Sequence, residues 1–280
     1  MAKGESFFEI LNAAIADIAE HGFDKLERIA YWQDRLRRAA EASMTPTDRM
    51  RKMLSDAMRA LYRANIEKGG ILKHHPGVSR FTLERVRPAL HAELSRRIAA
   101  SADLIVLNKK EVVEKTLKRF AGWASSVPAG GSDTVKKPEI KKEIKKGLAS
   151  LPFEERRVLT DQGHKMISSL NTIIATDGGA IAAIWHSHYH QSGYNFREPH
   201  KEREIESKNK PFVVRGNWAL TAGLMKLDGA KYTDAMTQPG EEVFCRCYYQ
   251  YLYNLHDLPA AMITEKGRAS IKAAAEAMKA

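Results

Sequence analysis

The sequence predicts an α+β protein, in which a long all-helical N-terminal arm, residues 1–150, precedes a compact C-terminal module, residues 151–280, with a small, mostly antiparallel sheet. Two observations predict this division. Apolar residues recur at helical spacing almost continuously to about residue 176. After Asp177-Gly178-Gly179 the pattern changes to short β-branched and aromatic runs separated by glycine and proline, which is typical of strands.

The first helical pattern of the arm covers residues 5–43, with Gly22 as a break within it. The next helix is expected to start at Thr45-Pro46-Thr47-Asp48, where Thr45 can cap the first turn and Pro46 takes the first helical position. Gly69-Gly70 is expected to end that helix, because glycine readily adopts the left-handed conformation that closes a helix.

Two more helices are expected in the arm before a linker. The first runs from about residue 79 to 107, with Pro88 either kinking it or delimiting its first turn, and the second from 109 to about 125. The glycine- and proline-containing segment 127–133 is the clearest loop of the arm.

A lysine-rich amphipathic helix follows this loop. Ile140, Ile144 and Leu148 are four residues apart and form its apolar side. Its outer side carries Lys136, Lys137, Lys141, Lys142, Lys145 and Lys146. These lysines are the candidate nucleic-acid-binding residues, because such a face can lie against phosphates. A helix that is merely solvated is the alternative, since Glu139 and Glu143 interleave with the lysines.

The module is expected to begin with a helix over about residues 152–177. Strands are predicted at 180–189, 212–214 and 243–253, where β-branched and aromatic residues concentrate. An alanine- and lysine-rich helix over about 264–278 closes the chain.

Composition narrows the classes of function. The chain has 280 residues and a formal net charge of +11, which favours an acidic partner such as nucleic acid, although many soluble proteins are simply basic. Two cysteines exclude a disulfide scaffold and fit a reducing compartment. The N-terminus lacks the pattern of a signal peptide, and the apolar stretches are too short to span a bilayer. We therefore expect a protein made and kept in the cytoplasm, or inside something assembled there.

Both cysteines lie in the segment from Gln238 to Leu258, which enters its predicted strand through the Pro239-Gly240 turn. On a strand, Cys245 and Cys247 share one face and Arg246 takes the other. Arg246 is expected to pair with a carbonyl or with an acidic group; the nearby acidic candidates are Glu241, Glu242 and Asp257. The two thiols fit half of a metal site, a redox pair, or two small core residues, and we expect them to be structural.

Histidines supply the remaining candidate metal ligands. His186, His188 and His190 alternate and would share a face of a strand, and His200 follows them. Zinc accepts imidazole and thiolate ligands, so a closed tetrahedral zinc site would combine Cys245 and Cys247 with two of these histidines. Histidines stacked on aromatic rings are the alternative.

Signatures of catalysis are absent from the sequence. It contains no Gly-x-Ser-x-Gly, no glycine-rich phosphate loop and no His-Glu-x-x-His. We expect no enzyme, with a metal-dependent His/Cys hydrolase, a Cys–His nucleophile or a stand-alone DNA-binding module as alternatives.

A resemblance covers about residues 155–260. Trp185, Arg197-Glu198-Pro199-His200, Lys210-Pro211-Phe212-Val213 and the segment Gln238–Cys247 follow one another in the order and spacing of minor head proteins similar to gene F of phage Mu. The residues that carry the family's motif are Trp185, Arg197, His200, Pro239, Gly240, Cys245, Arg246 and Cys247. Family members also carry a long, variable helical region ahead of this module.

The resemblance implies a structural component of a virion. Proteins of this family are found inside the phage head near the portal vertex and act in head assembly, with some touching or accompanying the packaged DNA. The implied partners are the portal protein, the major capsid protein and packaged double-stranded DNA, with no membrane in the assembled head. The helical arm, residues 1–150, would then be the half that contacts portal or capsid.

Overall fold

The structure is a computed structural model that describes residues 6–22, 26–44, 48–128, 138–148 and 151–278. The chain forms two compact units, the first built from residues 1–55 and 98–159, the second from 56–97 and 160–280. Helices and a small antiparallel sheet together give the predicted α+β class, with the sheet confined to the C-terminal part. The division of function between residues 1–150 and 151–280 stays a prediction.

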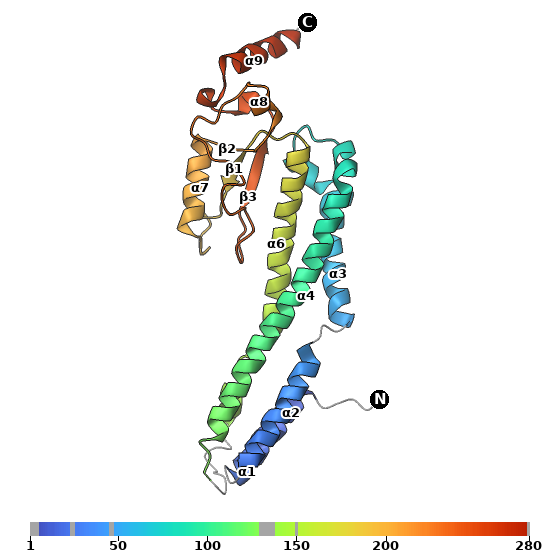
Figure 1. Cartoon of the computed structure of the whole chain (residues 1–280), viewed down its shortest axis with the longest axis vertical. Helices are drawn as coiled ribbons and strands as arrows, with labels where there is room; N and C mark the ends of the chain where they lie inside the picture. The colour runs from blue at the N-terminus through green and yellow to red at the C-terminus, as the bar shows by residue number, and fades with distance from the viewer. Residues whose placement is uncertain (1–5, 23–25, 45–47, 129–137, 149–150, 279–280) are drawn as a thin grey trace. The chain divides into compact units, whose positions relative to one another are not determined.

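The first unit is helical. It contains α1 (Phe7–His21), α2 (Leu26–Met44), α5 (Pro138–Lys145) and parts of α3 (Asp48–Tyr62), α4 (Arg80–Ala124) and α6 (Leu151–Asp177) (Figure 1). Ser6 caps α1: its hydroxyl accepts from Glu9 N at 3.3 Å, and the Glu9 carboxylate accepts from Ser6 N at 2.8 Å. The buried side chains of this unit form an apolar core that includes Ile15, Leu36 and Phe120.

Gly22, with φ 70°, ends α1 as expected, and α2 continues the helical pattern predicted for residues 5–43. Another helix prediction for the arm is wrong in detail. The helices expected at 79–107 and 109–125 are one continuous helix, α4, that runs through Pro88. Pro88 lies on the exposed side, where a carbonyl that loses its helical partner can face water. Around Leu107 the sequence offers no glycine or proline, and the buried Ile105 and Val113 hold the helix on both sides.

Gly69-Gly70 closes the α3 region as predicted, but only after an added π-turn. This π-helix covers Arg63–Glu67, Gly69 adopts φ 71°, and a 3-10 helix covers Gly70–His74. The expected helix start at 45–47 lies outside the described residues.

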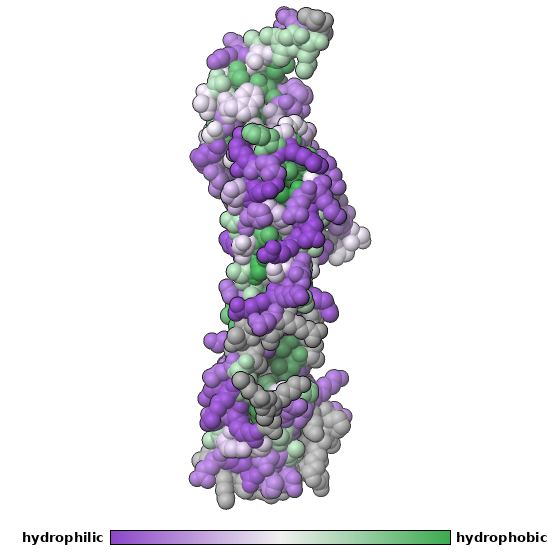
Figure 2. All heavy atoms as spheres, turned by 90° about the vertical axis from the view of Figure 1, so that its right-hand side faces the viewer, coloured by the Kyte–Doolittle hydropathy of each residue, from purple (hydrophilic) through white to green (hydrophobic). Residues whose placement is uncertain are grey.

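Among the residues described, no helix combines the length and the apolarity needed to cross a lipid bilayer. Figure 2 shows hydrophobic residues in patches separated by hydrophilic residues on the face that it presents.

The second unit contains a three-stranded antiparallel sheet in the order β2-β1-β3. Strand β1 (Ala182–His186) pairs with β2 (Phe212–Val213) and with β3 (Tyr248–Leu252). The side chains alternate as the strand period requires: Ala183 and Trp185 join one core, and Ala182 and Ile184 join the other. All three strands are shorter than predicted, and Cys245 and Cys247 precede β3 instead of lying within it.

Helix α7 (Glu198–Asn209) was not expected from the sequence and covers the edge of β1 that the short β2 leaves unpaired. Ser207 Oγ accepts from Trp185 N at 2.9 Å, and Glu204 Oε2 accepts from Ser187 N at 2.7 Å. These bonds supply the partners that a neighbouring strand would supply. Helices α8 (Trp218–Thr221) and α9 (Glu265–Ala277) and two short 3-10 turns, Leu255–Asp257 and Ala260–Met262, complete the unit.

Candidate functional site

A turn held by helix α6 positions the two cysteines. Gly240 adopts φ 83°, and a Cβ atom there would lie 3.1 Å from Ser168 Cβ, so both the conformation and the space favour glycine. Ser168 Oγ donates a hydrogen bond to the Pro239 carbonyl. Phe244 adopts the left-handed φ of 59°, which is rare for a bulky residue, and its backbone N–H donates to Asp161 Oδ1 at 2.6 Å. The turn is therefore fastened to α6 at two points.

Beyond this turn, both thiols meet one imidazole. His200 Nδ1 lies 3.3 Å from Cys247 Sγ and 3.7 Å from Cys245 Sγ. The three side chains are buried, with 4%, 6% and 1% of His200, Cys247 and Cys245 exposed. Gly240 N–H donates to Cys245 Sγ at 3.4 Å. We call His200, Cys245 and Cys247 the thiol–imidazole cluster.

The other ring nitrogen of His200 is held by a carboxylate. His200 Nε2 lies 3.1 Å from Glu242 Oε1, and Arg197 Nε lies 2.8 Å from Glu242 Oε2. Arg197 also donates to the Val243 carbonyl at 2.7 Å. The hydrogen bond from His200, outweighing burial, lowers the pKa of Glu242 below its usual value. A carboxylate on Nε2 leaves Nδ1 free to face the sulfurs.

The two thiols influence each other strongly. The hydrogen bond from Cys247, outweighing burial, lowers the pKa of Cys245 to about 5. The same hydrogen bond, together with burial, raises the pKa of Cys247. The pair therefore gives up its first proton easily and its second with difficulty, which is the behaviour of two coupled sites.

These three donor atoms fit three of the four ligand positions of a tetrahedral zinc ion. The three donor atoms lie within 4.8 Å of one another. A tetrahedral zinc, with a Zn–S distance of about 2.3 Å and a Zn–N distance of about 2.0 Å, separates sulfur from nitrogen by about 3.5 Å. The distances of 3.3 and 3.7 Å bracket that value. A ligand histidine that gives its second nitrogen to a carboxylate, as His200 does to Glu242, is the usual outer shell of a zinc site.

The expected closed site with two histidines is not assembled among the described residues. The thiol–imidazole cluster is the only group of three or more potential ligands there. His186 stacks on Tyr248, with ring centroids 5.0 Å apart, and His188 Nε2 lies 3.0 Å from the Arg246 carbonyl. His190 Nε2 lies 3.2 Å from Glu204 Oε1. The three histidines separate because β1 ends at His186, so the alternation that would have kept them on one face stops there.

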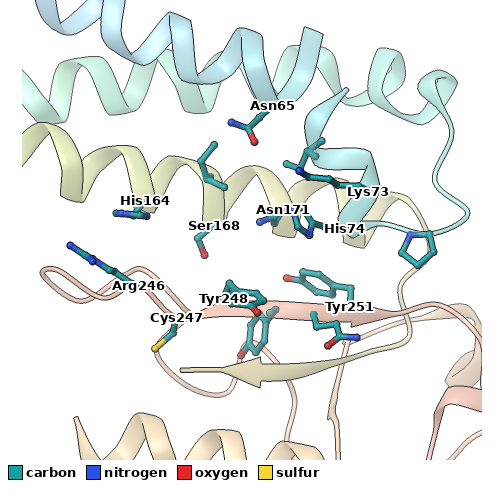
Figure 3. A pocket seen from close by; sticks show the side chains of 15 residues that line it. Asn65, Lys73, His74, His164, Ser168, Asn171, Arg246, Cys247, Tyr248 and Tyr251 are labelled. Atoms are coloured by element: carbon teal, nitrogen blue, oxygen red, sulfur yellow. The ribbon is translucent and has the colours of Figure 1, made fainter. Parts of the chain in front are cut away.

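The expected partner of Arg246 is also wrong, because Glu242 is taken by Arg197. Within the described part of the chain the Arg246 guanidinium has no hydrogen bond or ion pair. Arg246 is exposed, as the alternation with its buried neighbours predicts, and it lines one end of a cavity shown in Figure 3.

The lysine-rich helix exposes fewer lysines on its outer side than its sequence suggests. Lys142 and Lys146 are exposed, with Lys146 3.7 Å from the Glu143 carboxylate. Lys145 turns inward, with its ammonium 4.5 Å from the Phe8 ring centre and a hydrogen bond to Asn12. Ile144 is buried as predicted. Lys136 and Lys137, and the side chain of Lys141, lie outside the described residues.

Sequence reasoning missed two buried carboxylates that support the site. Asp161 fastens the turn to α6, and Glu204 fastens α7 to β1. Both are placed by tertiary contacts, and no spacing in the sequence distinguishes them from exposed helix carboxylates.

No protein-family model matches the chain, and neither a curated protein nor a solved structure matches it significantly.

Proposed function

We propose that the protein is a structural component of a phage head, similar to the Mu gene F minor head proteins, that binds portal or capsid and lies beside packaged DNA. The observation that carries the proposal is that most motif residues behind the resemblance contact one another. Trp185 and His200 have ring centroids 5.3 Å apart, and His200 also faces both thiols. A motif whose members assemble around buried thiols favours a structural role.

Charge supports the second part of this proposal. The net charge of +11 and the exposed Lys142 and Lys146 favour a neighbour rich in phosphate. The helices of the first unit would supply the surface for portal or capsid, since helical faces dock readily on other subunits.

The decisive experiment purifies tagged full-length protein from cells that are producing the phage. Portal or capsid protein should be recovered with it in a fixed ratio. The Cys245→Ser/Cys247→Ser variant should lose this recovery together with thermal stability, whereas His256→Gln, a change at an exposed histidine, should retain both. If the tagged protein is recovered with neither head protein, the proposal is wrong.

Zinc content tests how the cluster is built. We expect about one zinc per chain in protein purified without chelator, and a lower melting temperature after chelation. His200→Ala should remove the metal, because it deletes one of three ligands. Protein that contains no zinc, and that chelators leave unchanged, would show that the cluster is held by packing and hydrogen bonds alone.

A second candidate, a thiol-dependent hydrolase or transferase, rests on the line Cys247–His200–Glu242. A thiol 3.3 Å from an imidazole that is itself 3.1 Å from a carboxylate is the arrangement of a nucleophile, a base and an orienting acid. Burial argues against it: in Figure 3 the Cys247 sulfur points away from the side chains that line the neighbouring cavity. Mapping iodoacetamide adducts on native protein separates the two candidates. A structural thiol is modified only after denaturation, whereas rapid modification of Cys247 alone would favour thiol chemistry.

A further inference from the structure

A cavity of about 520 Å³ lies between helix α6 and strand β3 in the second unit. Tyr248 and Tyr251 of β3 form its floor, and Ser168 and Asn171 of α6 lie opposite (Figure 3). The volume falls in the range of sites for small molecules or single residues of a polymer. Neither the resemblance nor the thiol–imidazole cluster assigns a role to this cavity.

The cavity wall carries two cationic side chains, Arg246 and Lys73. His74 and His164 also line it, with burial lowering the pKa of His164, and no aspartate or glutamate does so among the described residues. Neither Arg246 nor Lys73 makes a side-chain hydrogen bond or an ion pair within the described part of the chain. Their charges are therefore available to a negatively charged occupant.

These cations stand at two ends. Figure 3 shows Arg246 beside His164 at one end of the cavity, and Lys73 with His74 near Asn171 at the other. His164 and Asn171 are seven residues apart on α6, which corresponds to about 10 Å along a helix. An occupant that uses both ends must carry negative charge at two separated points.

Between the two ends the cavity offers a flat apolar surface. The Tyr248 side chain is 44% exposed, and its ring is already held by stacking on His186, with an angle of 11° between the planes. A ring fixed in this way loses little freedom when a second flat group stacks on it. Asn65, Ser168 and Asn171 add hydrogen-bonding groups to the opposite wall.

From this arrangement we propose that the cavity binds single-stranded nucleic acid, with phosphates at the Arg246 and Lys73 ends and a base stacked over Tyr248. Cationic grooves with aromatic platforms are the common means of holding unpaired strands. A free mononucleotide would satisfy only one cationic end, and a duplex would keep its bases away from the tyrosine. The inference goes beyond the proposed structural role and does not depend on it.

Fluorescence anisotropy with labelled oligothymidylate of about six nucleotides tests the proposal on the full chain. Arg246→Gln and Tyr248→Leu should each weaken binding about tenfold, as loss of one phosphate contact or one stacked base predicts. Arg246→Gln should also lower the slope of log affinity against log salt by about 0.7. Lys272→Gln removes a charge from an exposed position on α9 away from the cavity lining and should change affinity less than twofold.

Competition identifies the occupant. The unlabelled oligonucleotide should displace the probe far better than duplex of equal length, thymidine monophosphate or inorganic phosphate. Displacement by the monophosphate at equal concentration would replace a strand site with a mononucleotide site, and displacement by phosphate alone would reduce it to an anion site. Equal binding by Arg246→Gln, Tyr248→Leu and unmodified protein, all with unchanged melting temperatures, would overturn the proposal.

Discussion

The cores of the two units differ in what they bury. In the described residues, twelve polar or charged side chains are buried; the first unit contributes only Ser101 and Thr116, and the second contributes the other ten, among them every ionisable one. The first unit is thus held by apolar contact between helices. The second depends on buried hydrogen bonds that fix individual side chains.

This difference predicts that the core of the first unit tolerates substitutions more readily than the core of the second unit. Apolar helix packing accepts many residues of suitable volume, so a unit of this kind can vary its outer faces freely. A buried carboxylate or imidazole must keep its partners, because an unpaired buried charge is costly. The second unit therefore has the more exacting sequence requirements, and the thiol–imidazole cluster and the cavity both lie there. The predictions below test this contrast, from the largest expected effect to the smallest.

The largest predicted loss of stability comes from truncating a buried side chain in the core of the first unit. Phe120 is fully buried, and Phe120→Ala should lower the free energy of unfolding by about 3–5 kcal/mol. Phe81, which is 73% exposed, provides the control, and Phe81→Ala should cost less than about 0.5 kcal/mol. Denaturant unfolding combined with hydrogen exchange would localise the loss. Equal protection of the first unit in both variants would show that its core does not depend on this ring.

Removing a buried charge should have a comparable effect in the second unit. Glu204 is 1% exposed and accepts from Ser187 N at 2.7 Å, Ser187 Oγ at 2.8 Å and Lys208 Nζ at 2.7 Å. Burial opposes its ionisation, but these hydrogen bonds outweigh burial and lower the pKa from 4.5 to about 2. Glu204→Gln should cost on the order of 3 kcal/mol at neutral pH. Glu202→Gln, a change on the exposed side of the same helix, should cost little.

The pH dependence follows from the same shift. Because the folded pKa lies below the unfolded value, the stabilisation is fully present above about pH 5 and is lost as pH falls toward 2. Glu204→Gln should therefore flatten the stability profile between these limits. If the variant keeps the full acid sensitivity of the unmodified protein, another carboxylate is responsible.

The Pro239-Gly240 turn should show an intermediate effect. Gly240→Ala adds a Cβ atom 3.1 Å from Ser168 Cβ at φ 83° and should cost about 1–3 kcal/mol. Gly216 has φ 68°, and a Cβ atom added there would have no neighbour within 4 Å, so Gly216→Ala measures the conformational part alone. The difference between the two variants, measured by thermal unfolding, isolates the contact with α6. If both variants lose the same stability, α6 accommodates the added methyl group at Gly240 at no cost in free energy.

The contrast between the units also explains how much the sequence could predict. Helical periodicity predicted the helices of the first unit, since apolar spacing is the main determinant of such packing. In the second unit, helix α7 was missed because its buried Glu204 and Ser207 are polar and leave no apolar stripe. The common side of Cys245 and Cys247 was predicted correctly, because an extended segment alternates even where it forms no strand.

Other parts of the candidate site depend on tertiary contacts that spacing does not encode. His200 was among the predicted ligands, and its position on Glu242 comes from the placement of α7. Glu242 was a predicted partner of Arg246 but forms its ion pair with Arg197, and predicting this requires knowing which side of the turn faces α7. Because Glu242 pairs with Arg197, the Arg246 side chain is available to the cavity.

The smallest predicted effect concerns the exposed lysines of the first unit. Lys142→Gln/Lys146→Gln should leave stability unchanged and lower the salt slope for duplex DNA by up to about 1.8, because each phosphate contact contributes about 0.9. Lys145→Gln is the matched control on the same helix: its ammonium faces Phe8, so it should affect stability before it affects the slope. Affinity for single strands at the cavity should be unaffected by all three substitutions. An unchanged duplex slope in the double variant would place the contact with double-stranded DNA elsewhere on the protein.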